Sequence, residues 1–341
     1  MTTSLTQFRD ELTEALLDFI WRQWCLLGVA GTAHPLPEHR IIDPEALFAF
    51  SSTIARHDAR LFDEIMDWTL KNGKWINIQR LSNIIVKDHI GETATVGAIA
   101  DWMASHDVRM KWKGVAAKFR RRSDPSPEML FHSQRKSKMP PLKDQDPVFS
   151  EYGLIRPPIS LRGLSHSVDL TADANMVIRL RGLFGVGVRA DVISYLLTHE
   201  SGHARHIAEF LGYNHMRVQE LLNNLVEAGL LGAKRLGRKK EHFVRRREWR
   251  AALSLSDSPL EWIDWRAFYR GIGKVFAALW SIDEQRADEY IAVSLLNDAM
   301  DQAETDLYRA GLDLSSDSYA ASRDWTRLNN LAVSVRELSQ G

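Results

Sequence analysis

The stretch AEFLGYNHMRVQELLNNLVEAGLL, residues 208–231, predicts two helices joined by a tight turn. Gly212 can adopt the positive φ that ends a first helix, and Asn214 can cap the helix that follows. Apolar residues then recur at a spacing that places them on one helical face; they are Val218, Leu221, Leu222 and Leu225. Two helices that pack through these faces, with the outer face of the second left free, form a helix-turn-helix.

The residues on either side of this stretch extend it into a larger module. Upstream, residues 188–198 (VRADVISYLLT) predict a supporting helix with an apolar inner face. Downstream, Leu230–Arg235 and Glu241–Arg247 alternate enough to predict two short strands, joined by Leu236–Lys240 around Gly237. The sequence therefore predicts a β-hairpin directly after the second helix of the motif.

The hairpin region is strongly basic. Between residues 230 and 250 only Glu241 and Glu248 are acidic, whereas nine side chains are basic: Lys234, Arg235, Arg238, Lys239, Lys240, Arg245, Arg246, Arg247 and Arg250. Cations at this density can neutralise phosphates and release the counterions condensed around a DNA duplex. The composition favours a hairpin that contacts a nucleic-acid backbone.

Taken together, these motifs resemble the winged-helix regulators of the MarR and ArsR type over residues 187–250. The resemblance implies a groove-facing surface on the second helix of the motif, formed by Asn214, His215, Arg217, Gln219, Glu220, Asn223 and Asn224. Arg, Asn and Gln can read base edges in pairs of hydrogen bonds. On the hairpin, or wing, the implied DNA-binding residues are Lys234, Arg235, Arg238, Lys239, Lys240 and Arg245.

The net charge of zero conceals a segregation along the chain. Residues 1–72 carry 6 basic and 11 acidic side chains, residues 255–341 carry 8 and 15, and residues 73–254 carry 30 and 18. A positive middle between acidic ends indicates a segment that binds a polyanion, flanked by regions with another task.

Helical patterns flank the module on both sides. Before it they cover residues 5–27, 45–56, 59–71, 76–87, 95–105 and 111–122, and after it residues 260–281, 284–310 and 319–338. Asp43 and Pro44 are typical of a cap and a first helical residue. Seven of the eleven prolines lie between residues 123 and 160, which predicts a linker or an extended segment packed on a domain surface.

We therefore expect a mainly α protein in four parts. They are a helical N-terminal domain at 1–122, a proline-rich linker or extended segment at 123–172, the winged helix-turn-helix domain with its short β-hairpin wing at 173–252, and a C-terminal helical region at 259–341. The C-terminal region offers apolar faces that suit either a dimer interface or an ordinary bundle within the chain. They are formed by Trp262, Trp265, Phe268, Ile272, Val275 and Phe276 and, further along, by Tyr290, Val293, Leu296 and Met300.

A second motif, His199-Glu200-Ser201-Gly202-His203, matches the H-E-x-x-H pattern of zinc proteases. In the winged-helix register Ser201 and Gly202 fall at a turn, so the two histidines do not share a helical face. A third zinc ligand is also required, and Glu220 and Glu227 already belong to the recognition helix. A metal-sensing group of His199, His203, His206 and His215 stays open, beside the simpler interpretation of surface histidines.

These patterns predict sequence-specific DNA binding by a transcription regulator, without catalysis, cofactor or bound metal. One recognition helix covers few base pairs, so we expect a homodimer on double-stranded DNA, with a small-molecule effector or a protein partner as a further option. The lone Cys25 and the charges that interrupt Leu16–Val29 favour a cytoplasmic protein without a membrane span. The alternatives are a winged-helix adaptor or antitoxin-like partner and, more remotely, a zinc metalloprotease.

Overall fold

The computed structural model describes residues 4–31, 39–107, 110–120, 126–134, 138, 140–237, 239–255, 258–282, 288–312 and 325–340. Helices make up most of this part of the chain, which confirms the expected mainly α class. None of the described helices is long and apolar enough to cross a lipid bilayer.

The N-terminal helices follow the predicted ranges closely. They are α1 (Leu5–Leu26), α2 (Pro44–Ile54), α3 (Ala59–Asn72), α4 (Ile78–Asn83), α5 (Thr93–His106) and α6 (Lys113–Phe119). The side chain of Asp43 caps α2 by accepting from the backbone N–H of Ala46 at 3.1 Å, with Pro44 as the first helical residue. The predicted helix at 76–87 is divided, because α4 continues into a π-helical turn, η3 (Ile84–Asp88).

The proline-rich region is packed against the N-terminal helices. It contains β1 (Glu128–Met129), α7 (Pro147–Ser150) and β2 (Leu154–Ile155), and β1 pairs with β2 in parallel. Beyond β2 the chain runs extended past α3, where Asp67 accepts hydrogen bonds from the N–H groups of Gly163 and Ser165. The prolines predicted either a linker or an extended segment packed on a domain surface. The contacts with α3 favour the extended segment.

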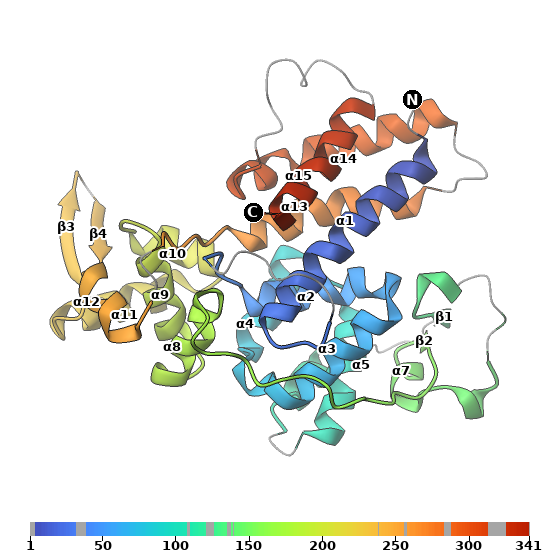
Figure 1. The fold of residues 1–341 in the computed structure, drawn as a ribbon, viewed down its shortest axis with the longest axis horizontal. Helices are drawn as coiled ribbons and strands as arrows, with labels where there is room; N and C mark the ends of the chain where they lie inside the picture. Colours follow the sequence, from blue (N-terminus) through green and yellow to red (C-terminus); the bar gives the residue numbers. More distant parts are fainter. Residues whose placement is uncertain are drawn as a thin grey trace.

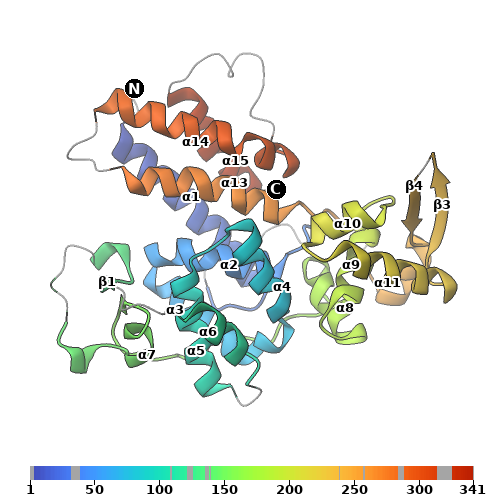
Figure 2. The same ribbon diagram turned by 180° about the vertical axis from the view of Figure 1, so that it is seen from behind.

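The predicted DNA-binding module projects from one end of the molecule (Figures 1 and 2). Its elements are α8 (Met176–Phe184), α9 (Val188–Thr198), α10 (Ala204–Leu211), α11 (His215–Glu227), β3 (Gly232–Leu236), β4 (Lys239–Phe243) and α12 (Arg246–Leu253). The strands β3 and β4 are antiparallel and pair Leu236 with Lys239, so the connection is shorter than expected.

One strand boundary in the module was predicted wrongly. The second strand was expected to reach Arg247, but β4 ends at Phe243 and residues 246–253 form α12. The register explains the difference, because Phe243 pairs with Gly232, the first residue of β3, and no partner strand remains for later residues. Arg245, expected on the wing, is instead the residue that precedes α12.

The C-terminal helices are α13 (Trp265–Ser281), α14 (Glu289–Arg309) and α15 (Trp325–Gln340). They pack beside α1 in a bundle above the other N-terminal helices (Figure 1). Phe19 of α1 contacts both Trp265 and Phe268, with ring centroids 5.6 and 5.5 Å apart.

The apolar face of α13 is not available for dimerisation. Its predicted anchors are all buried within the chain: Trp265, Phe268, Ile272, Val275 and Phe276, together with Trp262 before the helix. Of the two alternatives, the intrachain bundle holds for this face. On the second predicted face, on α14, Leu296 and Met300 are buried, whereas Tyr290 is 83% exposed. The expected start of the last helix, at residues 319–324, lies outside the described residues.

Candidate nucleic-acid interface

The turn between α10 and α11 is built as the sequence predicts. Gly212 adopts a left-handed φ of +75° and ends α10, and Asn214 caps α11 by accepting from the N–H of Met216 at 2.9 Å. A Cβ on Gly212 would lie 2.9 Å from Cζ of Arg266, so both the backbone conformation and the close packing require glycine here. Val218, Leu221, Leu222 and Leu225 form the buried face of α11.

The turn is held from two sides by buried arginines that the sequence analysis did not single out. Arg80 of α4 donates from Nε to the carbonyl oxygen of Leu211 at 2.7 Å. Arg266 of α13 donates from Nη1 to the carbonyl oxygens of Glu209 and Phe210. These bonds satisfy carbonyls at the end of α10 that have no partner within the helix. The turn is thereby fixed to both the N-terminal and the C-terminal helices.

A buried charge network joins the module to the N-terminal helices. Arg181 of α8 donates to Glu45 at 2.6 and 2.7 Å and to Asp191 of α9 at 3.1 and 3.0 Å. Arg80 bonds Glu45 at 2.7 Å and forms a bidentate pair with Asp43. Because buried charges are tolerated only when they are paired, this network fixes the relative positions of four elements.

The ionisation of the network follows from its geometry. Burial raises the pKa of Asp43, but the charge and hydrogen bonds of Arg80 outweigh this effect and hold the pKa below its ordinary value. Tyr213, in the turn before α11, donates to Asp191 at 2.6 Å, and burial beside that carboxylate raises the pKa of the phenol well above its usual range. The phenol of Tyr213 is therefore neutral at physiological pH.

The hairpin is attached to the helices by backbone pairing. Gly202, in the α9–α10 connection, and His242 of β4 exchange two N–H to carbonyl hydrogen bonds, of 3.0 and 2.9 Å. A Cβ on Gly202 would lie 2.9 Å from side-chain atoms of Ile207 and Tyr195, so a larger residue here would force these side chains to shift. Lys240 also donates to the side chain of Asn223 at 3.2 Å, which connects the hairpin directly to α11.

The implied DNA-binding residues lie on α11 and the hairpin and remain accessible. Gln219 and Asn223 are half-buried and hydrogen-bonded to each other; the exposed members are Asn214, His215, Arg217, Asn224, Lys234, Arg235, Lys239, Lys240 and Arg245. The side-chain oxygen of Asn214 is already used as the helix cap. Arg238, expected at the tip of the wing, lies outside the described residues.

The hairpin cations are arranged in a way that opposes folding. Arg235 lies directly opposite Lys240 in the ladder, and like charges in this arrangement are destabilising. Lys234 lies opposite Glu241, whose carboxylate accepts from the hydroxyl of Ser201 at 3.3 Å. Over the residues that the structure describes, none of Lys234, Arg235, Lys239 and Lys240 forms an ion pair. This concentration of positive charge favours a negatively charged partner.

The histidines of the H-E-x-x-H motif lie on different helices. His199 follows the last residue of α9 and stacks on Tyr195 with ring centroids 3.9 Å apart, whereas His203 caps α10 by accepting from the N–H of His206. They therefore do not share a helical face. Within the described ranges no group of three or more His, Cys, Asp or Glu side chains is placed to hold a metal ion.

Comparisons with protein-family models, with curated proteins and with solved structures gave no match for this chain.

Proposed function

We propose that this protein binds double-stranded DNA through a winged helix-turn-helix, residues 188–244, and acts as a transcription regulator. In this arrangement α11 enters the major groove and the β3–β4 hairpin lies along the backbone. The observation that carries the proposal is the junction of two surfaces. The polar outer face of α11 is joined through Asn223 and Lys240 to a hairpin with four exposed cations, Lys234, Arg235, Lys239 and Lys240, which form no ion pair within the described part of the chain.

The chemistry of α11 suits base recognition. Arg217 and Asn224 project from exposed positions, and the half-buried Gln219 and Asn223 are held by a mutual hydrogen bond of 3.3 Å. Side chains of these types form bidentate contacts with guanine and adenine in the major groove. The first N–H groups of α11 add a partial positive charge suited to a phosphate.

The attachment of the module supports recognition as a rigid unit. Arg80 and Arg266 fix the end of α10, and the pairing of Gly202 with His242 fixes the hairpin against the helices. Ordered side chains and a fixed backbone reduce the entropy that DNA binding costs. The helix α12 follows the hairpin in the chain, and its Arg247 and Arg250 are two further cations in this part of the module.

The test is selection from a pool of random duplexes by the purified full chain. We expect enrichment of a defined sequence, and loss of enrichment when Lys234, Arg235, Lys239 and Lys240 are changed to alanine. The matched control changes Lys87, Lys113, Lys118 and Lys143, four exposed lysines elsewhere, to alanine and alters the net charge equally. Loss of binding in both variants, or in neither, would contradict a specific role for the hairpin.

A second function, docking of a protein partner, is favoured by one observation. Met216 of α11 and Leu236 of the hairpin are 66% and 67% exposed, and Glu220 and Glu227 are acidic positions on the outer face of α11. Exposed apolar side chains in this setting suit a protein surface. This alternative would be established by three results together. A protein partner co-purifies with the chain in a fixed ratio, the Met216→Ser variant no longer retains that partner, and the purified chain binds no DNA.

A further inference from the structure

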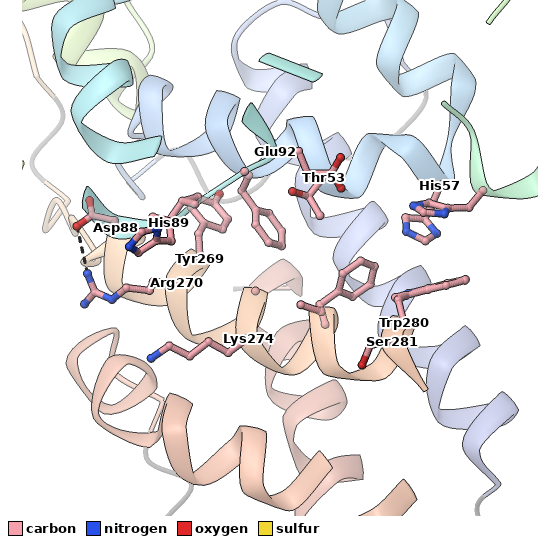
Figure 3. A pocket seen from close by; sticks show the side chains of 17 residues that line it. Thr53, His57, Asp88, His89, Glu92, Tyr269, Arg270, Lys274, Trp280 and Ser281 are labelled. Atoms are coloured by element: carbon pink, nitrogen blue, oxygen red, sulfur yellow. Dashed lines mark hydrogen bonds and ion pairs between the residues drawn. The ribbon is translucent and has the colours of Figure 1, made fainter. Parts of the chain in front are cut away.

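A cleft of about 520 Å³ lies between the N-terminal helices and α13, away from the proposed DNA-binding surface. Its walls come from α2 and the 3-10 turn η1 (Ala55–His57), from the chain between η3 and α5, and from α13 (Figure 3). This volume falls in the range of small-molecule sites, which is about 300–1,000 Å³.

The backbone along one wall is irregular in three successive features. The π-helical turn η3 ends at Asp88, His89 follows with a left-handed φ of +55°, and Gly91 has a φ of +84°. A Cβ on Gly91 would lie 2.2 Å from the carbonyl oxygen of Ala49, so the chain approaches α2 too closely for any side chain. π-Helical turns and left-handed non-glycine residues are frequent at ligand sites, where the surrounding structure maintains the strain.

One end of the cleft is aromatic. The rings of His57 and His132 stack with their centroids 4.0 Å apart. The ring centroid of Trp280 lies 4.3 Å from that of His57 and 5.3 Å from that of His132. Phe276 meets His57 edge-on at 5.2 Å. These rings contact one another, and the guanidinium of Arg9 lies over Trp280 at 4.9 Å, so a planar ligand ring would gain apolar and edge contacts with the half-buried group.

The other end of the cleft is charged. Asp88, His89, Arg270 and Lys274 lie there, on the opposite side of Tyr269 from Trp280 (Figure 3). Arg270 donates to Asp306 from Nε at 2.9 Å but reaches Asp88 from Nη1 only at 3.4 Å, which is long for a hydrogen bond. Arg270 and Lys274 share the carboxylate of Asp306, and Arg270 and Arg266 share that of Asp88, so each of these carboxylates serves two cations.

The charged end is connected to the helix-turn-helix through one residue pair. Asp88 accepts from Nε and Nη2 of Arg266 at 2.7 and 2.5 Å. The same guanidinium donates to Glu209 and Phe210 at the end of α10 and packs on Gly212. An anion that engages Nη1 of Arg270 therefore competes with Asp88, the residue that positions Arg266 against the turn.

We propose that this cleft binds a small molecule with an anionic group and a planar ring, and that its occupancy changes DNA affinity through Asp88 and Arg266. The anionic group lies at Arg270 and Lys274, and the ring lies against His57, His132 and Trp280. The effect on DNA rests on the proposed function, whereas binding in the cleft does not. An aromatic carboxylate and a nucleoside monophosphate share the required chemistry.

Arg270 and Trp280 are ten residues apart on α13, about 15 Å along the helix, so the site calls for extended probes. Calorimetry on the full chain, with 4-(1-pyrenyl)butyrate and with adenosine monophosphate as separate probes, tests the site. Gly273 lies on the cleft wall, and a Cβ there would meet only Phe50, at 3.9 Å. Gly273→Ala therefore keeps the cleft open, whereas Gly273→Leu fills it. We expect saturable binding of one probe to the wild type and to Gly273→Ala, and no binding to Gly273→Leu. Trp280→Ala should weaken binding about three- to tenfold, as expected for the loss of an aromatic contact.

The coupling is tested separately by measuring DNA affinity with and without the probe that binds. We expect a change of about fivefold or more, the lower range of allosteric coupling. Arg266→Lys should keep the binding of the probe and lose this change, because an ammonium cannot bridge Asp88 and the end of α10 as a guanidinium does. Absence of saturable binding by both probes would overturn the site, and binding with unchanged DNA affinity would overturn the coupling.

Discussion

Two groups of charged residues in the same module differ in how their charges are satisfied. In the buried network, Arg181 lies between Glu45 and Asp191, and each of its nitrogens donates to a carboxylate. In the exposed hairpin, Arg235 faces Lys240 across the ladder without an acidic partner among the described residues. The first group secures the module to the rest of the chain, while the second reduces stability and leaves its charge available to a partner.

The largest effect is expected from opening the buried network. Arg181→Met leaves Glu45 and Asp191 buried without their shared cation, and removal of one partner of a buried pair costs about 3–5 kcal/mol. The free energy of unfolding, from denaturant titration, measures this loss. Arg205→Met removes an exposed cation whose contact with Glu209 is 3.8 Å long and should cost under about 0.5 kcal/mol. Equal losses in the two variants would show that the network does not anchor the module.

A smaller effect, on DNA rather than on folding, is expected on α11. Arg217→Ala should reduce the preference for the selected sequence over a scrambled one by about 1–3 kcal/mol, the value of one bidentate base contact. Fluorescence anisotropy with both duplexes measures it, with Lys113→Ala on α6 as the control. A uniform loss on both duplexes would instead assign Arg217 to the phosphate backbone.

A pH effect is expected at the attachment of the hairpin. His242 is fully buried, and burial lowers the pKa of its imidazole below the ordinary value. Unfolding allows the ring to take up a proton at about pH 6.5, so its contribution to stability is complete above that pH and is lost as the pH falls through the folded-state pKa. Hydrogen exchange at the amides of Gly202 and His242, corrected for intrinsic rates, should show less protection at pH 5.5 than at pH 7.5.

In the His242→Phe variant this pH dependence should become smaller. The remaining part comes from His199, because burial also lowers the pKa of that imidazole. Protection that is equal at both pH values in the unmodified chain would show that the buried imidazole does not destabilise the hairpin at low pH.

The smallest effect separates stability from binding within the hairpin. Arg235→Thr removes the like charge opposite Lys240 and should raise stability by about 0.2–1 kcal/mol while weakening DNA binding. Thermal unfolding and DNA titration of the same preparation measure both quantities. Lys113→Ala serves again as the control. Unchanged or lower stability would contradict the repulsion, and unchanged or tighter DNA binding would contradict the role of Arg235 in binding.

Local signals predicted α10, α11 and the turn between them, whereas long-range contacts could not be predicted. Gly212 and Asn214 act on their own neighbours, so their roles are readable from the sequence. Arg80 is 131 residues away in the chain from Leu211, whose carbonyl it bonds, and Arg266 is 56 residues away from Phe210. No local sequence pattern indicates such distant partners. The end of β4 was misplaced because it depends on where β3 begins.

The central claim is most directly tested by the salt dependence of DNA affinity. The dissociation constant for the selected duplex is measured over a salt series, for the wild type and for the variant with Lys234, Arg235, Lys239 and Lys240 changed to alanine. Each phosphate contact contributes about 0.9 to the slope of log affinity against log salt, so we expect the slope to fall by about 3 to 4 in the variant. An unchanged slope would show that the hairpin does not contact DNA.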